Sequence, residues 1–323
     1  IPGRGKFTVT LDTETLPEGV KLTGNQELKV DVNLDMGQSV SFALNAAEVV
    51  GTPRGQQLIN ATMGGLKFGL IMALAAVGLT LIFGTTGLTN FAHGEMVVFG
   101  SLVAYGFNVA LGLPLILAGV LAVFVGGFAG WVQDKTLWKP LRSRGTGIIA
   151  MMIVSIGFGL ALRYIFQLVF GPSTRPYNEW VNQSKNNYLG VFNLADKEIG
   201  IMTVSIAVLA VTLIGLNKSR LGKAMRAVSD NTALSASSGL RVDGVISNVW
   251  VLGGALSALA GVLYGINSQV NFMNGYQMLL LIFAAVTLGG LGSIWGAIIG
   301  SLIIGIVMEV GPLFGVPTSI KEV

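Results

Sequence analysis

Residues 78–100 read GLTLIFGTTGLTNFAHGEMVVFG, and the fold prediction starts from this stretch. Two apolar runs flank a polar island, Asn90-Phe91-Ala92-His93-Gly94-Glu95, which holds the only histidine of the protein. Glycines at positions 84, 87 and 94 make a continuous helix unfavourable here. Ionisable groups and interrupted helices are costly at membrane depth, so the stretch predicts a pathway or a structural joint between moving parts.

The composition supports a membrane location. The chain is 52% hydrophobic and 11% charged, with a mean hydropathy of +0.70, whereas soluble domains carry about 25% charged residues. Its 45 glycines suit close helix packing in lipid. The net charge of +4 is small and does not indicate a nucleic-acid partner. The absence of cysteine excludes disulfides and thiolate chemistry, and one histidine excludes a multi-histidine metal site within this chain, so no metal or cofactor is expected.

The apolar runs predict an all-α polytopic membrane domain over residues 58–323, with about eight or more transmembrane helices, some of them broken. A span needs about 20 apolar residues. The second run is short, and it is expected to form a half-helix pair with residues 84–94. The expected spans are 63–83, 95–111, 114–132, 147–170, 200–216, 245–266, 276–290 and 294–311.

Residues 1–57 differ from the rest of the chain. Apolar and polar residues alternate over 6–11, 27–34 and 39–44, with turn residues between these runs, which is typical of half-buried strands. The pattern predicts a small all-β extracytoplasmic module with a linker at its end.

Basic loops set the predicted orientation, because positive charge accumulates on the cytoplasmic side. Loops 133–146 and 217–243 are basic and are placed in the cytoplasm, whereas the balanced loop 171–199 is placed outside. This assignment leaves both termini outside, and the tail 315–323 then looks cut short before another span.

The segment 217–243 carries basic residues three apart, at Arg220, Lys223 and Arg226, followed by small residues up to Gly239. A helix, a bend at Gly239 and a second helix would form a cytoplasmic knob that docks on a partner. The alternative interpretation is a solvated basic loop that only obeys the charge rule.

This segment resembles the coupling loop of ABC-transporter permeases, and most closely that of the branched-chain amino acid permease family. The similarity rests on Arg220-Leu221-Gly222, Met225-Arg226-Ala227 and Gly239 with Val242-Asp243, together with the stretch 87–95 and the glycine-rich runs 258–265 and 287–297. One departure is Ala233-Leu234-Ser235, which stands where the loop's usual glutamate-alanine-alanine would be.

The resemblance implies a permease subunit of an ATP-driven importer in a bacterial plasma membrane, working by alternating access. The implied partners are two ATP-binding subunits, a second permease subunit and an external solute-binding protein. The chain is not expected to be an enzyme, because no Gly-x-x-x-x-Gly-Lys-Ser/Thr phosphate loop occurs in it. The extra β module has no counterpart in the usual permease.

Three groups of residues are candidates for function. The first either lies along the substrate pathway or caps and locks a helix break inside the bundle. The second is the ATPase coupling segment, and the third is a tight intracellular turn or hinge. These groups are, in order, Thr85, Thr86, Asn90, His93 and Glu95; then Arg220, Gly222, Arg226 and Gly239; then Gly289, Gly290 and Gly292.

Three isolated charges lie within the predicted spans: Lys67, Arg163 and Glu309. Lys67 and Glu309 lie near predicted span ends and are expected to extend to the membrane surface, whereas Arg163 either extends in this way or pairs with another helix. Three other functions stay open: a urea or short-amide permease of the same family, a secondary transporter driven by an ion gradient, and a membrane enzyme that uses His93 and Glu95.

Overall fold

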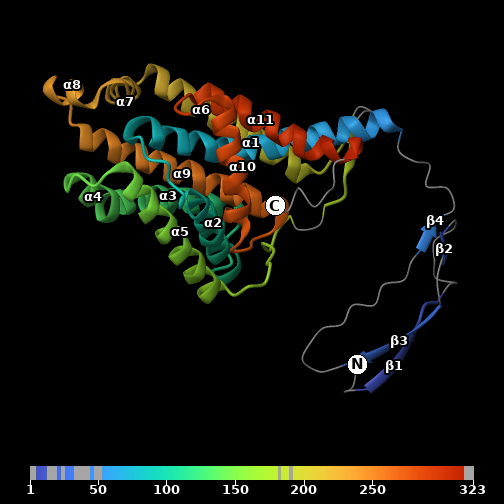
Figure 1. The fold of residues 1–323 in the computed structure, drawn as a ribbon. Coiled ribbons are helices and arrows are strands. Elements are labelled where there is room, and N and C mark those ends of the chain that lie inside the picture. Colours follow the sequence, from blue (N-terminus) through green and yellow to red (C-terminus); the bar gives the residue numbers. More distant parts are fainter. Residues whose placement is uncertain are drawn as a thin grey trace. The chain divides into compact units, whose positions relative to one another are not determined.

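The computed structural model describes residues 5–12, 20–22, 26–32, 44–46, 53–180, 183–188 and 192–315. The chain divides into two compact units, Ile1–Gln57 and Leu58–Val323, and Figure 1 shows the elements of each.

The first unit contains two separate strand pairs. β1 (Gly5–Thr10) pairs with β3 (Glu27–Val32), and β2 (Val20–Leu22) pairs with β4 (Leu44–Ala46), both antiparallel. Phe7 and Val9 are half-buried while Thr8 and Thr10 are exposed, as the alternating pattern requires. The third predicted run lies mostly at 39–43, outside the described residues. Two short pairs do not amount to the complete β domain that the sequence suggested.

The second unit is helical, because its apolar runs are long enough to satisfy their backbone hydrogen bonds internally. Each of the eight predicted spans coincides with a helix. The helices are α1 (Arg54–Thr86), α2 (His93–Tyr105), α3 (Leu115–Gln133), α4 (Lys139–Ser143), α5 (Ile148–Phe170), α6 (Asp196–Lys218), α7 (Arg220–Asp230), α8 (Thr232–Ser237), α9 (Val242–Ser268), α10 (Asn274–Gly289) and α11 (Ile294–Val310).

Three short segments with altered helical winding extend these helices. The π-helical η2 (Gly106–Ala110) follows α2, the π-helical η3 (Asp134–Trp138) joins α3 to α4, and the 3-10 turn η4 (Gly311–Phe314) ends α11. A two-stranded sheet of β5 (Asn186–Tyr188) and β6 (Phe192–Leu194) lies between α5 and α6.

Among the described residues, six helices are long and apolar enough to cross a membrane: α1, α3 with its extension through α4, α5, α6, α9, and α11 with η4. The prediction of about eight or more membrane-spanning helices, some of them broken, is therefore corrected to six spans among the described residues, with two shorter helices beside them. At about 1.5 Å per residue, the 16-residue α10 reaches only about 24 Å, short of an apolar layer of about 30 Å. α2 has 13 residues before its π-helical end. These two short helices are the irregular part of the bundle.

Glycines bring the long helices into backbone contact. A Cβ at Gly130 of α3 would strike the Trp250 carbonyl of α9, and one at Gly65 of α1 would lie 2.6 Å from the Ile306 Cα of α11. Close approach of this kind replaces the hydrophobic driving force that lipid does not supply between helices. α1 is buried along most of its length, so it forms the core of the bundle.

The two predicted cytoplasmic loops lie together. Figure 1 shows α4, α7 and α8 at the same end of the helical unit, on the left of the view. At the opposite end, Lys67 of α1 does not extend to the surface as expected but forms a buried ion pair with Glu198 of α6, with Nζ and Oε1 2.6 Å apart. The pair satisfies two charges that would be costly to bury separately.

Candidate functional site

The break between α1 and α2 lies over residues 87–92, which are not helical. Gly87 has φ +69°, a conformation that other residues adopt at a cost. The Asn90 side chain is fully buried, and its Oδ1 accepts a hydrogen bond from the Ala92 amide at 3.1 Å. This turn ends the extended stretch and starts α2 at His93, so Asn90 shapes the break.

His93 joins three helices. Its Nε2 lies 2.8 Å from the Ala75 carbonyl oxygen of α1 and 3.1 Å from the Ser257 hydroxyl of α9, and the ring is fully buried. Because a carbonyl oxygen only accepts, Nε2 carries the proton and donates to it. Nδ1 has no hydrogen-bond partner in the described part of the chain. The histidine therefore fixes the first turn of α2 against α1 and α9.

Glu95 pairs with Arg163, so of the two roles predicted for this arginine the structure shows pairing with another helix and not extension to the membrane surface. The Oε1 atom of Glu95 lies 2.6 Å from Nη2 and 3.1 Å from Nε of Arg163. The guanidinium also lies over the Tyr276 ring of α10, 4.4 Å from its centroid. One arginine of α5 thus holds the starts of both short helices, and only 2% of the Glu95 side chain is exposed.

The start of α10 repeats the start of α2 in sequence and in geometry. Asn90-Phe91-Ala92-His93-Gly94 precedes and opens α2, and Asn271-Phe272-Met273-Asn274-Gly275 does the same for α10. The Asn271 Oδ1 accepts from the Met273 amide at 2.8 Å, as Asn90 does from Ala92. The connection before α2 contains Gly87, with φ +69°, and the connection before α10 contains Gln269, with φ +67°. Each connection therefore has one residue in the left-handed region.

The two short helices meet at their first turns. A Cβ on Gly94 would strike the Gly275 carbonyl, and a Cβ on Gly275 would strike the Gly94 carbonyl. The contact is therefore reciprocal, as expected for two copies of one unit related by an approximate two-fold axis. Asn271 and Gly275 were not predicted as site residues, although the Asn-Phe-x-x-Gly pattern is repeated in the sequence.

Thr85 and Thr86 close the other side of the break. Their hydroxyls donate to carbonyl oxygens of the last turn of α1, Thr85 to Leu81 at 3.0 Å and Thr86 to Ile82 at 2.6 Å. The Thr86 hydroxyl also accepts from the Leu88 amide at 3.2 Å. The Leu88 amide lies beyond the end of α1, and the Thr86 hydroxyl gives it an acceptor.

The predicted coupling segment is helical, with a break earlier than expected. α7 and α8 are separated at Asn231, whose side chain caps α8 by accepting from the Leu234 amide at 2.9 Å. Gly239, with φ +82°, then forms the turn between α8 and α9. The predicted bend at Gly239 therefore exists, but both helices of the segment precede it.

α7 has two distinct faces. Arg220, Lys223 and Arg226 are exposed, whereas Gly222, Met225 and Val228 are buried, three residues apart on the opposite face. The Ser229 hydroxyl donates to the Gly84 carbonyl of α1 at 2.5 Å. Arg226 donates to the Leu216 carbonyl of α6 at 3.3 Å, and a Cβ on Gly222 would collide with that same carbonyl.

A cavity of about 250 Å³ brings residues of all three candidate groups together. It lies between α7, the ends of α1 and α6, and the turn between α10 and α11. The turn is tight, with Gly290 and Gly292 at φ +92° and +88°, and Gly289 packs directly on Gly296. The candidates that line the cavity are Thr85, Gly222, Arg226 and Gly292. Asn90, His93 and Glu95 are instead held in the bundle interior, so the structure separates the candidates into two clusters.

Comparison with known proteins identifies the family of the chain. The family described as the branched-chain amino acid transport system / permease component matches residues 61–323. The chain is 34% identical over 271 residues to the high-affinity branched-chain amino acid transport system permease protein LivH of Salmonella typhimurium, covering 78% of this chain and 83% of that protein. LivH of Escherichia coli K12 gives the same values. BraD of Pseudomonas aeruginosa, a permease protein of the same kind of system, is 31% identical over 79% of this chain and 85% of its own length. The chain is therefore a multi-pass membrane protein that belongs to the family of permease components of branched-chain amino acid transport systems.

Proposed function

We propose that this chain is a plasma-membrane permease subunit of an ATP-driven importer for branched-chain amino acids, working by alternating access. Membership of the family supports transport as the activity, and the names of LivH and BraD support the class of solute. ATP hydrolysis is assigned to separate subunits, since the sequence has no phosphate-binding loop. The proposed complex has two ATP-binding subunits, a second permease subunit and an external solute-binding protein.

The observation that carries the mechanism is the two-sided attachment of α7. Its basic face is exposed to a partner, while Gly222, Met225 and Val228 of the opposite face are buried against the bundle. Two further contacts attach the helix, Ser229 to α1 and Arg226, from the edge of the basic face, to α6. Movement of an ATPase docked on α7 is therefore transmitted to two membrane helices at once. The adjacent cavity leaves space for α7 to shift against the turn between α10 and α11.

We assign the interior cluster to the joint of the moving parts. Asn90, His93 and Glu95 hold the first turn of α2 against α1, α9 and α5. Short helices whose first turns meet inside the bundle present the positive ends of their dipoles to the same region, which suits the carboxylate of an amino acid. In this proposal the cluster positions those helix ends, and direct contact of its side chains with the solute is the alternative.

The topology follows from the charge distribution. The end of the bundle with α4, α7 and α8 is assigned to the cytoplasm. On that assignment the end of the bundle with Lys67, Glu198 and the β5–β6 pair is external. Residues 1–57 precede the membrane unit in the chain, and they are proposed to act as an extracytoplasmic module.

Uptake of labelled leucine, and separately of urea, into vesicles that hold the assembled transporter tests the proposal. ATP-dependent leucine uptake is expected. Urea uptake alone would keep the mechanism and replace the solute, whereas uptake without ATP would replace the mechanism by a gradient-driven carrier.

Charge reversal at Arg226 tests the coupling step. Arg226→Glu is expected to leave membrane insertion intact and to uncouple ATP hydrolysis from leucine uptake, because it reverses the docking face and breaks the bond to α6. Arg144→Glu is the matched control, since Arg144 is exposed at the same end of the bundle but lies outside α7. Normal coupled uptake in the Arg226 variant would refute docking through this face.

A further inference from the structure

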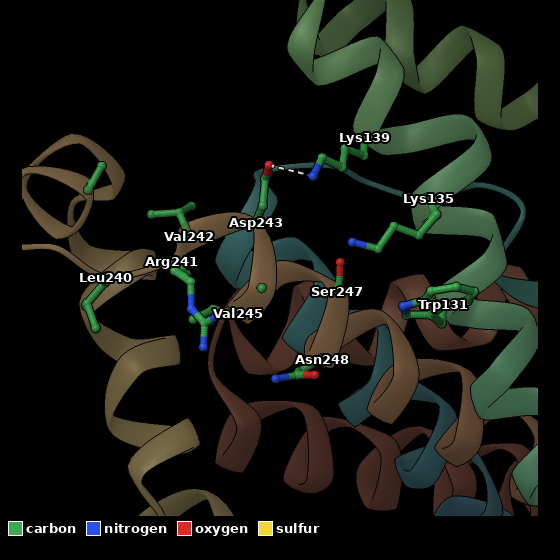
Figure 2. Close-up of a pocket in the computed structure, with 12 residues that line it drawn as sticks. Trp131, Lys135, Lys139, Leu240, Arg241, Val242, Asp243, Val245, Ser247 and Asn248 are labelled. Atoms are coloured by element: carbon green, nitrogen blue, oxygen red, sulfur yellow. Dashed lines mark ion pairs between the residues drawn. The ribbon is translucent and has the colours of Figure 1, made fainter.

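A second cavity, of about 860 Å³, opens at the cytoplasmic end of the bundle, away from the coupling cavity. One wall is the end of α3 with η3 and the start of α4, and the other is the junction between α8 and α9 (Figure 2). Trp131, Lys135 and Lys139 line the first wall, and Arg241, Ser247 and Asn248 belong to the second. Figure 2 shows the Lys135 side chain projecting into the space between the walls.

The lining carries an excess of positive charge. Lys135, Lys139 and Arg241 face one carboxylate, Asp243, which pairs with Lys139 at 3.0 Å. Within the described ranges, Lys135 and Arg241 have no ion-pair partner. Arg142 forms an ion pair at 2.7 Å with Asp134, beside the cavity, and the Ser247 hydroxyl donates to the same carboxylate at 2.6 Å. The Asp134 carboxylate is thus already bonded to Arg142 and Ser247, and it does not neutralise the charge of Lys135.

The start of α9 adds to this field. Its N-cap residue, Arg241, makes no side-chain capping bond, and Val242, Asp243, Gly244 and Val245 of the first turn line the cavity. The positive end of a 27-residue helix therefore lies beside two unpaired cations. Such a site fits a phosphate group.

An apolar stripe leads from this cavity along the membrane face of α3. Phe124, Phe128 and Trp131 are 72%, 63% and 40% exposed, and their spacing of four and three residues puts them on one helix face. Phe128 and Trp131 stack, with ring centroids 5.8 Å apart. Lys135 follows four residues later on the same face. A basic group above an exposed aromatic stripe matches an amphiphile with an anionic head and apolar chains.

We propose that this cavity binds the phosphodiester headgroup of an anionic phospholipid from the cytoplasmic leaflet, with the acyl chains along Phe124, Phe128 and Trp131. Lys135 and Arg241 bind the phosphate, beside the positive end of the α9 dipole. Because the α8–α9 junction forms one wall, the bound lipid holds the end of the coupling segment against α3. The proposal does not depend on which solute is transported.

Quenching of tryptophan fluorescence by brominated lipids tests the site in the assembled transporter in nanodiscs. Brominated phosphatidylglycerol is expected to quench Trp131 more strongly than brominated phosphatidylcholine at equal mole fraction. Trp131→Phe identifies its share of the signal, since Trp180 and Trp295 are also exposed. Lys135→Gln and Arg241→Gln are each expected to reduce the preference for phosphatidylglycerol about fivefold.

Arg144→Gln is the control, because it removes one exposed charge at the same end of the bundle outside the cavity. An equal loss of preference in this control would show diffuse attraction to the surface and overturn the proposal. Absence of Trp131 quenching in the complex would also overturn it, since a protein partner would then cover the cavity. Competition by glycerol 3-phosphate as strong as that by the lipid would assign the site to a soluble phosphate and refute the acyl-chain contact.

Discussion

Replacement of Arg163 by methionine is expected to lower the free energy of unfolding by about 4 kcal/mol. The guanidinium binds Glu95 through two nitrogens, at 2.6 and 3.1 Å from one carboxylate oxygen. Unit charges about 4 Å apart attract by about 4 kcal/mol at an effective dielectric constant of about 20, and loss of one partner of a buried pair costs about 3–5 kcal/mol. Only 2% of the Glu95 side chain is exposed, so water cannot replace the arginine.

The reciprocal variant is expected to be milder. Glu95→Gln leaves Arg163 with its contact to the Tyr276 ring and with 13% of its side chain exposed, so a loss of about 2 kcal/mol is expected. The double variant Glu95→Gln/Arg163→Met leaves no uncompensated buried charge, and its loss should fall well below the sum of the single losses.

Unfolding of the unaltered protein, the two single variants and the double variant by SDS in mixed micelles, followed by tryptophan fluorescence, measures these free energies. Arg144→Met should change the free energy by less than about 0.5 kcal/mol, because that side chain is exposed and away from such features. Additive effects of the two single variants, within about 0.5 kcal/mol, would show that the pair does not interact and would refute the reasoning.

Three further variants probe the joint and the coupling segment. Gly275→Ala is expected to lower the free energy of unfolding by about 1–3 kcal/mol and to slow uptake, because its Cβ would strike the Gly94 carbonyl. Gly157→Ala is the control and should be neutral or stabilising, because no atom lies within 4 Å of the added Cβ. Equal unfolding curves for the two variants would contradict the close crossing of α2 and α10. His93→Gln keeps a hydrogen-bond donor toward the Ala75 carbonyl, so size-exclusion chromatography should show more folded protein than for His93→Ala. Equal yields of active transporter from the two variants would argue against a structural role of His93. Gly222→Ala should push α7 away from the Leu216 carbonyl and reduce leucine uptake per ATP hydrolysed. Gly215→Ala is the control, because its added Cβ would meet no neighbouring atom within 4 Å. Unchanged coupling in the Gly222 variant would exclude α7 as the element that transmits the movement.

The positions of the helices could be predicted because lipid leaves few choices for an apolar segment. A run such as 147–170 must satisfy its own backbone, and it corresponds to α5, Ile148–Phe170. The roles of single charges could not be predicted in the same way. Lys67 was expected to extend to the surface and Arg163 either to do so or to pair with an unnamed helix, yet their partners, Glu198 and Glu95, lie 131 and 68 residues away along the chain. Hydropathy and spacing along one helix contain no information on such distant pairs.

The break at residues 87–92 was predicted from its glycines, but α10 was not recognised as the second short helix that packs against α2. The sequence assigned the half-helix pair to α2 and the end of α1, whereas the structure pairs α2 with α10. The reason is that residues 276–290 are apolar enough to pass for an ordinary span. Asn271 and Gln269 show the irregularity only through backbone conformation, with φ +67° at Gln269 and a side-chain turn at Asn271.

The two clusters of candidate residues are connected through α1 and α10. α7 is bonded to the end of α1 through Ser229 and Gly84, and the Ala75 carbonyl of the same helix binds His93 at the start of α2. α2 crosses α10 at Gly94 and Gly275, and α10 ends at the turn beside α7. A displacement of α7 can therefore reach the two short helices by two routes. One runs through α1 to the start of α2, and the other runs through the turn between α10 and α11 to the end of α10. If this connection transmits the movement, loosening the Gly94–Gly275 crossing should lower transport per ATP without lowering ATP hydrolysis itself, because the proposed docking site of the ATPase is the coupling segment and not the crossing. Loss of hydrolysis together with transport would place the block at α7 and not at the crossing.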